Sequence, residues 1–569
     1  MYTKGIPGRA LVMAMVLAAL AVSGFSQTAA ETGRKATVST DEISILKQEV
    51  SEQQKQIEAL QSAVNAMTQK LNHVGNITQL DSKTQTATPQ APRVGQVASS
   101  TPVIPTSLMT PENSSGTFAT ATPPLALVTN PQEKHADETS PLQLRVGNAY
   151  ITPVGFMDFT SVWRSSDVGS GIGTNFAGIP YGNIFQNNLS EFRLSMQNSR
   201  IGFRVDAMVH GAHVIGYTES DFLGNNPGNV AVSSNSNTMR SRLYWVDARK
   251  GKWEVLGGQT WTLLTPGRSG ISPLPGDIFF SQNIDVNYQL GLAWGRIPEL
   301  RFVYHPSDKA ALAIALDSPE QYVGGSAGGG LVTFPAALAA TYVNELNTGG
   351  NTLGVPNVAP DVIAKLALDP TKRFHFEVGG VAREFKLWDP ITKTTASSGG
   401  AGGFLNLNYE LFKGFRVVTN NFVSDGGGRY IFGQAPDLIA RADGTPSPIH
   451  ADSTASGFEY TNKNTLLFGY YGGLYVGRNV AIDAGGKPVG YGYAGSPAGQ
   501  NRAVQEGTFG FNQTLWKDAK YGALNFMGQY SYLTRNPWAV ASGQPANANL
   551  NMVFFDLRYS LPGAAPSMK

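Results

Sequence analysis

The sequence of 569 residues contains no cysteine, which excludes a disulfide framework, thiol catalysis and thiolate metal sites. Its formal net charge of +2 is too small to indicate binding to nucleic acid. After the first 30 residues no stretch stays apolar over about 18 residues, so no membrane-spanning helix is expected in the mature chain. A phosphate-binding loop of the form GxxxxGK[ST] is also missing, and no cofactor or metal is expected.

The first 30 residues follow the pattern of a secretory signal peptide. Lys4 and Arg9 precede an apolar run at 10–22, and small and polar residues come next. This run is shorter than the roughly 20 residues that a membrane-spanning helix needs. We therefore expect a signal peptide over residues 1–30, cleaved after Ser26 or Ala30.

Residues 39–74 predict a coiled coil. Ser39 and Glu42 form a capping box, and more than four heptads follow without a break. The apolar seam is narrow, which favours association with identical helices over packing on a core. Its core residues are Ile43, Leu46, Val50, Ile57, Leu60, Val64, Met67 and Leu71. Dimer and trimer remain open, because Gln53 also lies in the seam. Residues 75–140 are rich in Pro, Thr and Ser and predict an extended linker.

Residues 141–569 contain roughly sixteen or seventeen short segments in which apolar and polar residues alternate. In RIGFRVDAMV, residues 200–209, every second residue from Arg200 is polar or glycine up to Asp206, and those between are apolar. Such alternation gives a strand two unlike faces. We expect tight turns at 198–199 and 248–252. Long connections are expected at 166–188, 223–238, 323–360 and 426–462.

A soluble sandwich and a membrane barrel both show this alternation, so other features must decide. No separate segment exists to cover so many apolar faces, and the polar faces repeatedly carry charges. Aromatic residues near strand ends are typical of interfacial girdles: Trp163, Trp245, Trp253, Trp261, Tyr304, Trp388, Trp516, Trp538 and Tyr559. The predicted fold class is all-β, a transmembrane antiparallel barrel of about 16 strands, with 18 as the alternative. Barrels of this size enclose an aqueous channel.

Three segments resemble one known family. SRIGFRVDAMV, HVIGYTESDFLG and RSRLYWVDARKGKWEVLGGQTWTLL are similar to the DcaP-like outer-membrane porins, most strongly over residues 190–265. The resemblance implies a homotrimer of 16-stranded channels, a periplasmic coiled coil and a preference for small anionic solutes such as dicarboxylates. Further implied partners are outer-membrane lipid and lipopolysaccharide, with peptidoglycan as an additional candidate. One departure is the tail LPGAAPSMK after Tyr559, where porin chains usually end on an aromatic strand residue.

Charges on neighbouring strands are the candidates for solute selectivity, because a ring of one sign in a pore favours ions of the other sign. The candidate pore-lining residues are Glu191, Arg193, Arg200, Arg204, Asp206, Arg240 and Arg242. Mutual neutralisation with nearby acids, including Glu219 and Asp221, is the alternative. Residues 265–285 are the candidate constriction, with Arg268, Asp277 and Asp285, or else an ordinary surface loop.

Other functions are less well supported. GGSAG at 324–328 matches an esterase pattern, but glycines follow where a helix is required. We therefore expect no enzyme. A membrane anchor or adhesin whose coiled coil carries the function remains an alternative, although the barrel region dominates the mass. A secreted, soluble, glycan-binding β-protein is the third possibility.

Overall fold

The computed structural model describes residues 141–224, 238–279, 281–325, 329–348, 355–357 and 359–562. The predicted signal peptide, coiled coil and linker lie outside the described residues, as does the end of the C-terminal tail. Within the described part, no helix has the length and apolar character needed to cross a membrane.

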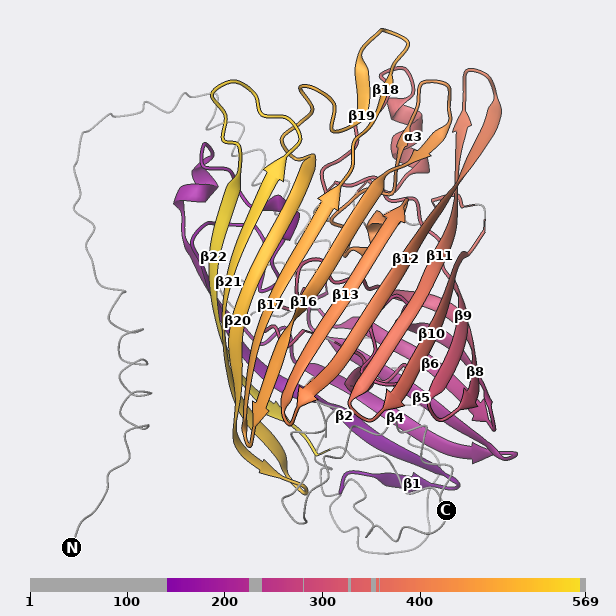
Figure 1. The fold of residues 1–569 in the computed structure, drawn as a ribbon, viewed down its shortest axis with the longest axis vertical. Coiled ribbons are helices and arrows are strands. Elements are labelled where there is room, and N and C mark those ends of the chain that lie inside the picture. Colours follow the sequence, from indigo (N-terminus) through magenta and orange to yellow (C-terminus); the bar gives the residue numbers. More distant parts are fainter. Residues whose placement is uncertain are drawn as a thin grey trace, which may run out of the picture. The chain divides into compact units, whose positions relative to one another are not determined.

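The described chain forms a closed antiparallel β-barrel (Figure 1). Its main sheet has 18 strands, of which β1 (Leu144–Val146) is a short edge piece. β3 and β4 share one position in the wall, which leaves sixteen positions. These are β2 (Ala149–Arg164), β3 with β4 (Glu191–Ser195 and Arg200–Val209), β5 (Ala212–Asp221), β6 (Arg240–Lys250), β7 (Trp253–Trp261), β8 (Arg296–Ser307), β9 (Ala310–Asp317), β10 (Asp361–Thr371), β11 (Phe374–Asp389), β12 (Thr394–Phe412), β13 (Phe415–Asp425), β16 (His450–Asn462), β17 (Thr465–Val476), β20 (Asn501–Asp518), β21 (Gly522–Pro537) and β22 (Ala548–Ser560). The predicted 16-stranded barrel is confirmed.

Pairing of the first and last strands closes the wall. β2 pairs with β22 from Phe156 opposite Ser560 to Arg164 opposite Met552. On its other side, β2 pairs with β4 and β3 in turn. A closed barrel leaves no strand edge unpaired, which is the only β arrangement that lipid tolerates.

The two ends of the barrel differ, as the turn signals predicted. Short turns join the strands at the lower end in Figure 1, and most connections at the upper end are long. The turn at 248–252 is confirmed by the pairing of Lys250 with Trp253. Upper connections carry the hairpins β14–β15 (Leu438–Ala440, Pro446–Pro448) and β18–β19 (Asn479–Ile482, Pro488–Tyr491) and the helix α3 (Ala339–Glu345). Four 3-10 turns lie there too: η3 (Phe176–Gly178), η4 (Phe185–Asn188), η5 (Pro275–Asp277) and η6 (Gly428–Tyr430).

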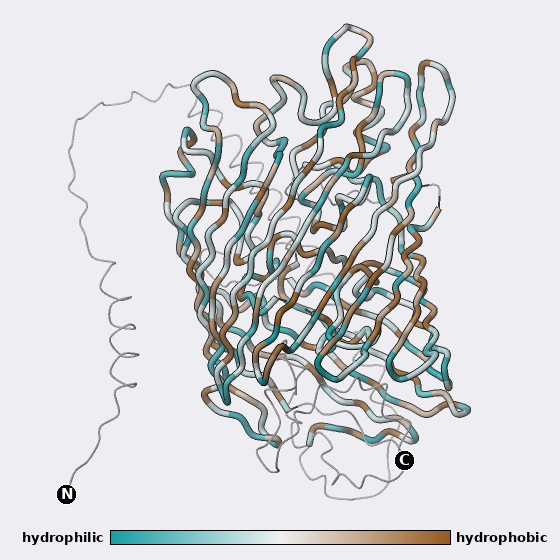
Figure 2. The backbone as a smooth tube through the Cα atoms, viewed as in Figure 1, coloured by the Kyte–Doolittle hydropathy of each residue, from teal (hydrophilic) through white to brown (hydrophobic). Residues whose placement is uncertain are grey.

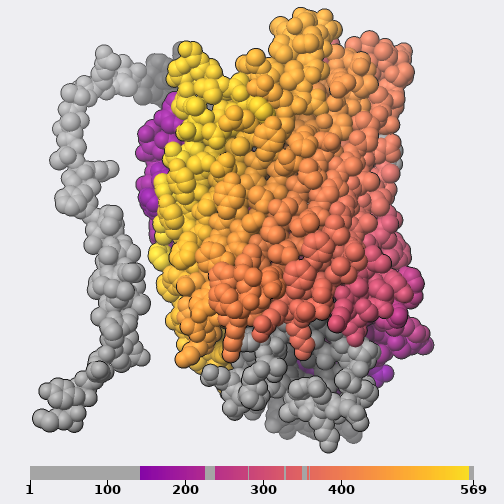
Figure 3. All heavy atoms as spheres, viewed as in Figure 1, coloured from indigo at the N-terminus to yellow at the C-terminus, as the bar shows by residue number. Residues whose placement is uncertain are grey.

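Alternation sorts the side chains between the two faces of the wall. In β9, Leu312, Ile314 and Leu316 are exposed outward, while the alanines between them and Asp317 are buried inward. Apolar and polar residues alternate along the strands in Figure 2. On the face shown in Figure 3, β11 to β22 form a continuous outer wall.

A turn forms at 196–199, closed by a bond from the Ser199 N–H to the Met196 carbonyl oxygen (3.0 Å), but the expectation that it joins two neighbouring strands of the wall is wrong. The segments on both sides of it pair with β2, so residues 196–199 interrupt one strand position instead of reversing the chain. Asp158 of β2 explains the interruption. Its carboxylate accepts a bond from Asn198 Nδ2 (3.1 Å), and its backbone N–H donates to Ser199 Oγ (3.0 Å).

Two further expectations need correction. The connection placed at 426–462 ends at residue 449, because β16 is a strand of the wall. Trp245 and Trp261 do not belong to an interfacial girdle, since both are buried on the lumen side. Trp245 stacks on Tyr217 of β5, with ring centroids 5.3 Å apart. Trp261 ends β7 and packs on Trp294, with centroids 5.4 Å apart.

A charge placed on the apolar outer face should destabilise the barrel. Ile314→Arg puts a cation beside Phe302 and Ala364, its neighbours across the sheet. We expect the free energy of unfolding in lipid vesicles to fall by about 2–4 kcal/mol. Ser307→Arg, at the short turn of the same hairpin, is the control and should change it by about 0–1 kcal/mol. Equal effects at both sites would contradict the orientation of this face.

Candidate functional site: the barrel lumen

The inner face of β3 to β6 carries the predicted pore-lining residues. Arg200, Arg204 and Asp206 occupy alternate inward positions of β4, separated by outward apolar residues. Glu191 and Arg193 lie opposite Arg164 and Val162, which face inward on β2. Arg240 and Arg242 of β6 face the acidic end of β5. All seven residues therefore lie on the lumen side of neighbouring strands, but they are spread along the wall, since Arg193 lies opposite Val162 of β2 and Asp206 opposite Tyr150.

Each of these arginines has a carboxylate partner. Arg204 donates twice to Asp206, at 2.8 and 2.7 Å. The other pairs are Arg193–Glu191 (2.8 Å), Arg200–Glu219 (3.6 Å), Arg240–Asp221 (2.8 Å) and Arg242 with Glu219 and Asp221 (2.8 Å each). Much of the local charge is thus balanced, as the alternative interpretation of these residues held. Their role in selectivity stays a prediction.

In two of these pairs the arginine is far more exposed than its partner, whereas Arg200, Arg204 and Arg242 are largely buried together with theirs. The side chain of Arg193 is 44% exposed and that of Glu191 only 8%. For Arg240 and Asp221 the fractions are 39% and 0%. The carboxylates lie against the wall and the guanidinium groups extend away from it. Solvent in this part of the lumen therefore contacts more positive than negative charge.

The described residues of the connection between β7 and β8, 262–279 and 281–295, fold into the lumen and cross it. Near one end, Arg268 donates to both carboxylate oxygens of Glu459 on β16, at 3.1 and 3.0 Å. Beside it, the Gly267 N–H donates to Glu377 of β11 (3.1 Å). These anchors lie across the lumen from β7, so this segment is no ordinary surface loop.

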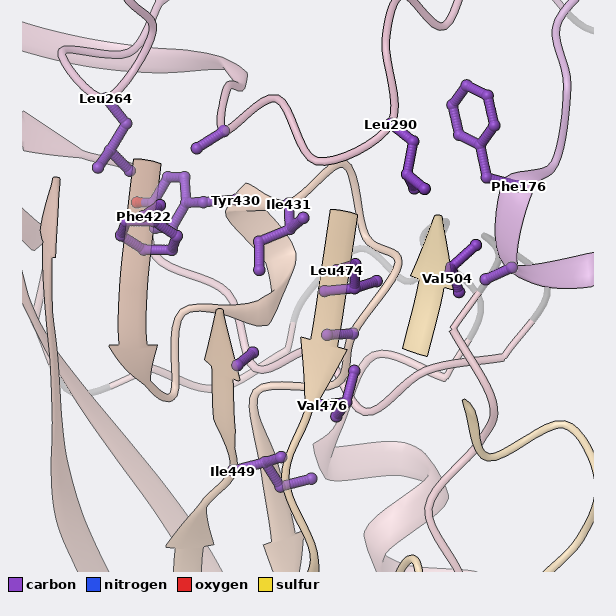
Figure 4. Close-up of a cluster of buried hydrophobic side chains, with 14 of the residues drawn as sticks. Phe176, Leu264, Leu290, Phe422, Tyr430, Ile431, Ile449, Leu474, Val476 and Val504 are labelled. Carbon is purple, nitrogen blue, oxygen red and sulfur yellow. The ribbon is translucent and has the colours of Figure 1, made fainter. Parts of the chain in front are cut away.

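Backbone N–H groups of the crossing segment bond its second half to side chains of the barrel wall. The N–H of Leu290 donates to Glu506 of β20 (2.9 Å), and the N–H of Ala293 donates to Asn420 of β13 (2.7 Å). Leu290 also joins a buried cluster that contains Phe176 and Val504 (Figure 4). Gly472 of β17 permits the close approach, because a Cβ there would lie 1.9 Å from the Leu290 carbonyl oxygen. Such contacts fix the segment against several strands at once.

The three predicted constriction residues do not form one cluster. Arg268 binds Glu459, while Asp285 accepts bonds from the backbone N–H groups of Thr174 and Asn287. Asp277 accepts a bond from Ser272 Oγ within the segment (2.8 Å). Burial raises the pKa of Asp277 to about 6, despite that bond and the nearby charge of Arg204. Among the described residues, no group of three or more His, Asp or Glu side chains is arranged to hold a metal ion.

Tyr288 is a lumen residue that sequence reasoning missed. Its hydroxyl accepts a bond from Arg242 Nη2 (3.1 Å), and its backbone is left-handed, with φ of +66°. Burial raises the pKa of this phenol, but the guanidinium groups of Arg242, Arg200 and Arg296 outweigh that effect and hold it at about 8. The sequence around Tyr288 does not indicate this cluster of positive charge, because the three arginines come from three separate strands.

The architecture defines a class of fold: a sixteen-stranded antiparallel barrel with one long connection folded into its lumen. The outer membrane channel DcaP of Acinetobacter baumannii has a similar structure, with a TM-score of 0.52 and 15% identity over 73% of this chain and 99% of that one. At this identity the likeness establishes the fold, which confirms what the sequence resemblance implied about architecture.

Two other solved structures match more weakly. They are an anion-selective porin from Comamonas acidovorans (TM-score 0.41, 12% identity, 73% of this chain and 100% of that one) and OprB of Pseudomonas putida (TM-score 0.39, 10% identity, 72% and 94%). These scores are too low to support an argument. No known family model matches the chain, and no curated protein is similar to it in sequence.

Loss of the Arg268–Glu459 pair should loosen the crossing segment. In Arg268→Ala we expect larger current fluctuations and a changed single-channel conductance in planar bilayers, because this end of the segment loses its two bonds to β16. Arg441→Ala is the matched control, since Arg441 lies in an exposed loop and its guanidinium group donates a bond only to Ser447 among the described residues, while its backbone bonds to Thr445 and Gly444 are kept in the variant. Identical current traces for both variants would show that the pair does not fix the segment.

Titration of Tyr288 should change the charge of the lumen above pH 8. Its phenolate adds a negative charge beside Arg242, so any preference for anions should fall as the pH rises from 7 to 9. In Tyr288→Phe this change should disappear, because no proton is left to lose. Reversal potentials measured in a salt gradient test this. An unchanged pH profile in the variant would exclude Tyr288 as the titrating group.

Proposed function

We propose that this protein is a porin of the bacterial outer membrane through which small hydrophilic solutes diffuse passively. A closed barrel with an apolar outer face and a charged inner face supports that assignment. In this proposal the chain acts as a channel and not as an enzyme. Its predicted coiled coil lies in the periplasm and its functional form is a homotrimer, as the sequence resemblance implies.

We further propose a preference for anions, with dicarboxylates as the class of solute implied by the resemblance. The observation that carries this is the unequal exposure of two ion pairs in the lumen. Arg193 and Arg240 extend toward solvent while Glu191 and Asp221 lie against the wall. A passing anion therefore meets guanidinium groups first, and a cation meets carboxylates that are already bonded.

Neutralising the two exposed arginines should reduce the preference for anions. For Arg193→Gln with Arg240→Gln, we expect the reversal potential in a KCl gradient to move toward cation selectivity. The flux of a four-carbon dicarboxylate into vesicles should also fall relative to that of a neutral solute of equal size. Both substitutions keep a polar, unbranched side chain, although a shorter one, and remove the charge.

The matched control replaces two exposed arginines in connections, Arg441→Gln with Arg373→Gln. Arg441 lies in the β14–β15 hairpin, and Arg373 lies in the short turn between β10 and β11. Here we expect no shift in reversal potential. Equal shifts in both double variants would contradict the assignment of selectivity to the lumen pairs. Folded protein that conducts no current would contradict the proposed porin function and favour the alternative in which the barrel serves as a membrane anchor.

A further inference from the structure

Arg296 is the first residue of β8, at the point where the crossing segment rejoins the barrel wall. In the sheet register it lies opposite Trp261, the last residue of β7. Asp221, the last residue of β5, lies opposite Arg240, the first residue of β6. These strands are consecutive neighbours in the wall (Figure 1), so all four residues lie at the end of the barrel that carries the long connections.

Among the described residues, we find no hydrogen-bond acceptor for the guanidinium group of Arg296. Its side chain is half-buried, and its Nη1 is enclosed without a partner. No carboxylate of the described chain forms an ion pair with it, whereas Arg240 and Arg242 both bind Asp221. Leaving a buried, charged donor without an acceptor costs free energy, and native structures rarely do so. Arg296 is therefore available to an acceptor from outside the chain.

Two aromatic rings hold the Arg296 guanidinium group in place. Its Cζ lies 5.1 Å from the ring centroid of Trp261 and 5.1 Å from that of Trp294. Both indoles are buried. Trp294 is fixed further, because its backbone N–H donates to the Tyr430 carbonyl oxygen (2.8 Å) and its ring stacks on Phe432, with centroids 4.9 Å apart. A guanidinium group packed on ring faces keeps the N–H groups along its edge free to donate.

The charge around Arg296 is positive in sum. Arg242 packs on the same Trp261 ring, with its Cζ 5.9 Å from the centroid. Four guanidinium groups and two carboxylates gather here: Arg200, Arg240, Arg242 and Arg296 with Glu219 and Asp221. The first three arginines already bind both carboxylates, so an excess of two positive charges remains. Burial raises the pKa of Tyr288, yet three of these arginines, Arg296 included, hold it at about 8. This end of the lumen therefore attracts negative charge.

The shape of the site favours a carboxylate over other anions. The two oxygen atoms of a carboxylate accept parallel bonds from the edge of a guanidinium group and lie in its plane. Chloride can accept at only one point. A tetrahedral phosphate places oxygen atoms above and below that plane, against the ring faces of Trp261 and Trp294, whose partial charge is negative. A planar group is thus the best match to Arg296.

We propose that Arg296, held between Trp261 and Trp294, binds one carboxylate group of a solute, so that the flux of such solutes saturates instead of rising in proportion to their concentration. Arg240, 39% exposed at the same end of the barrel, is available to the second carboxylate of a dicarboxylate. This inference deepens the proposed function and rests on it for the passage of solute. It adds a discrete binding site to a general preference for anions, and binding can be measured without any current.

Calorimetric titration of the folded, detergent-solubilised protein tests the site, with butanedioate as the probe and 1,4-butanediol as its neutral analogue. We expect saturable binding of butanedioate and none of the diol. Arg296→Gln should weaken binding about ten- to hundredfold, because hydrogen bonds to a charged group are lost. Arg296→Lys keeps the charge but lacks the planar edge. It should weaken binding almost as much while leaving the reversal potential in a KCl gradient unchanged, which a purely electrostatic role would not do.

Arg441→Gln, in an exposed loop, is the matched control and should bind butanedioate like the wild type. Heat-modifiable migration on gels shows whether each variant is folded. Equal affinity in the wild type and in folded Arg296→Gln would overturn the proposal, as would wild-type affinity in Arg296→Lys or equally tight binding of phosphate. Binding that is lost in Arg296→Gln, in a protein that conducts no current, would support the site and remove only the porin function.

Discussion

Closure of the backbone hydrogen-bond network between β2 and β22 is the constraint on which the structure depends. An open edge in lipid would leave a row of N–H and carbonyl groups without partners, at a cost of several kcal/mol for each group. Once the wall closes from Phe156 to Arg164, every strand has a fixed register with two neighbours. The two-residue period then assigns each side chain to the outer face or to the lumen. Charges collect inside because this geometry leaves them no other place.

Period-two alternation explains which strands could be predicted from the sequence. From Arg200 to Asp206 of β4 the apolar residues alternate with polar residues or glycine, and the structure keeps that pattern. β16 could not be found in this way, because Thr454 and Ser456 occupy its outward positions and alanines occupy inward ones. Residues 196–199 look like a turn but bond Asp158, a residue about forty positions away. The local sequence pattern therefore mispredicts the structure of a segment where contacts with residues distant in the chain determine it.

In the lumen, too, some features could be predicted from the sequence and others could not. Arg200, Arg204 and Asp206 were placed on one strand face from spacing alone, but the partners of Arg242 come from the neighbouring strand. Their alignment passes through an irregularity between Glu219 and Ser220 that no spacing reveals. Residues 265–285 stood out by composition as a possible constriction. The contacts that hold this segment are made by residues distant in the sequence. Arg268 binds a residue 191 positions later, and Leu290 binds one 216 positions later.

The direction of those anchors has a consequence for how the chain folds. Glu377, Glu459 and Glu506, which hold residues 262–295, all come after that segment in the chain. The segment therefore cannot reach its native position until strands synthesised much later have formed, and these contacts carry the loop-closure cost of long separations. Packing of the lumen segment is thus a late event of folding that depends on the formation of β11, β16 and β20.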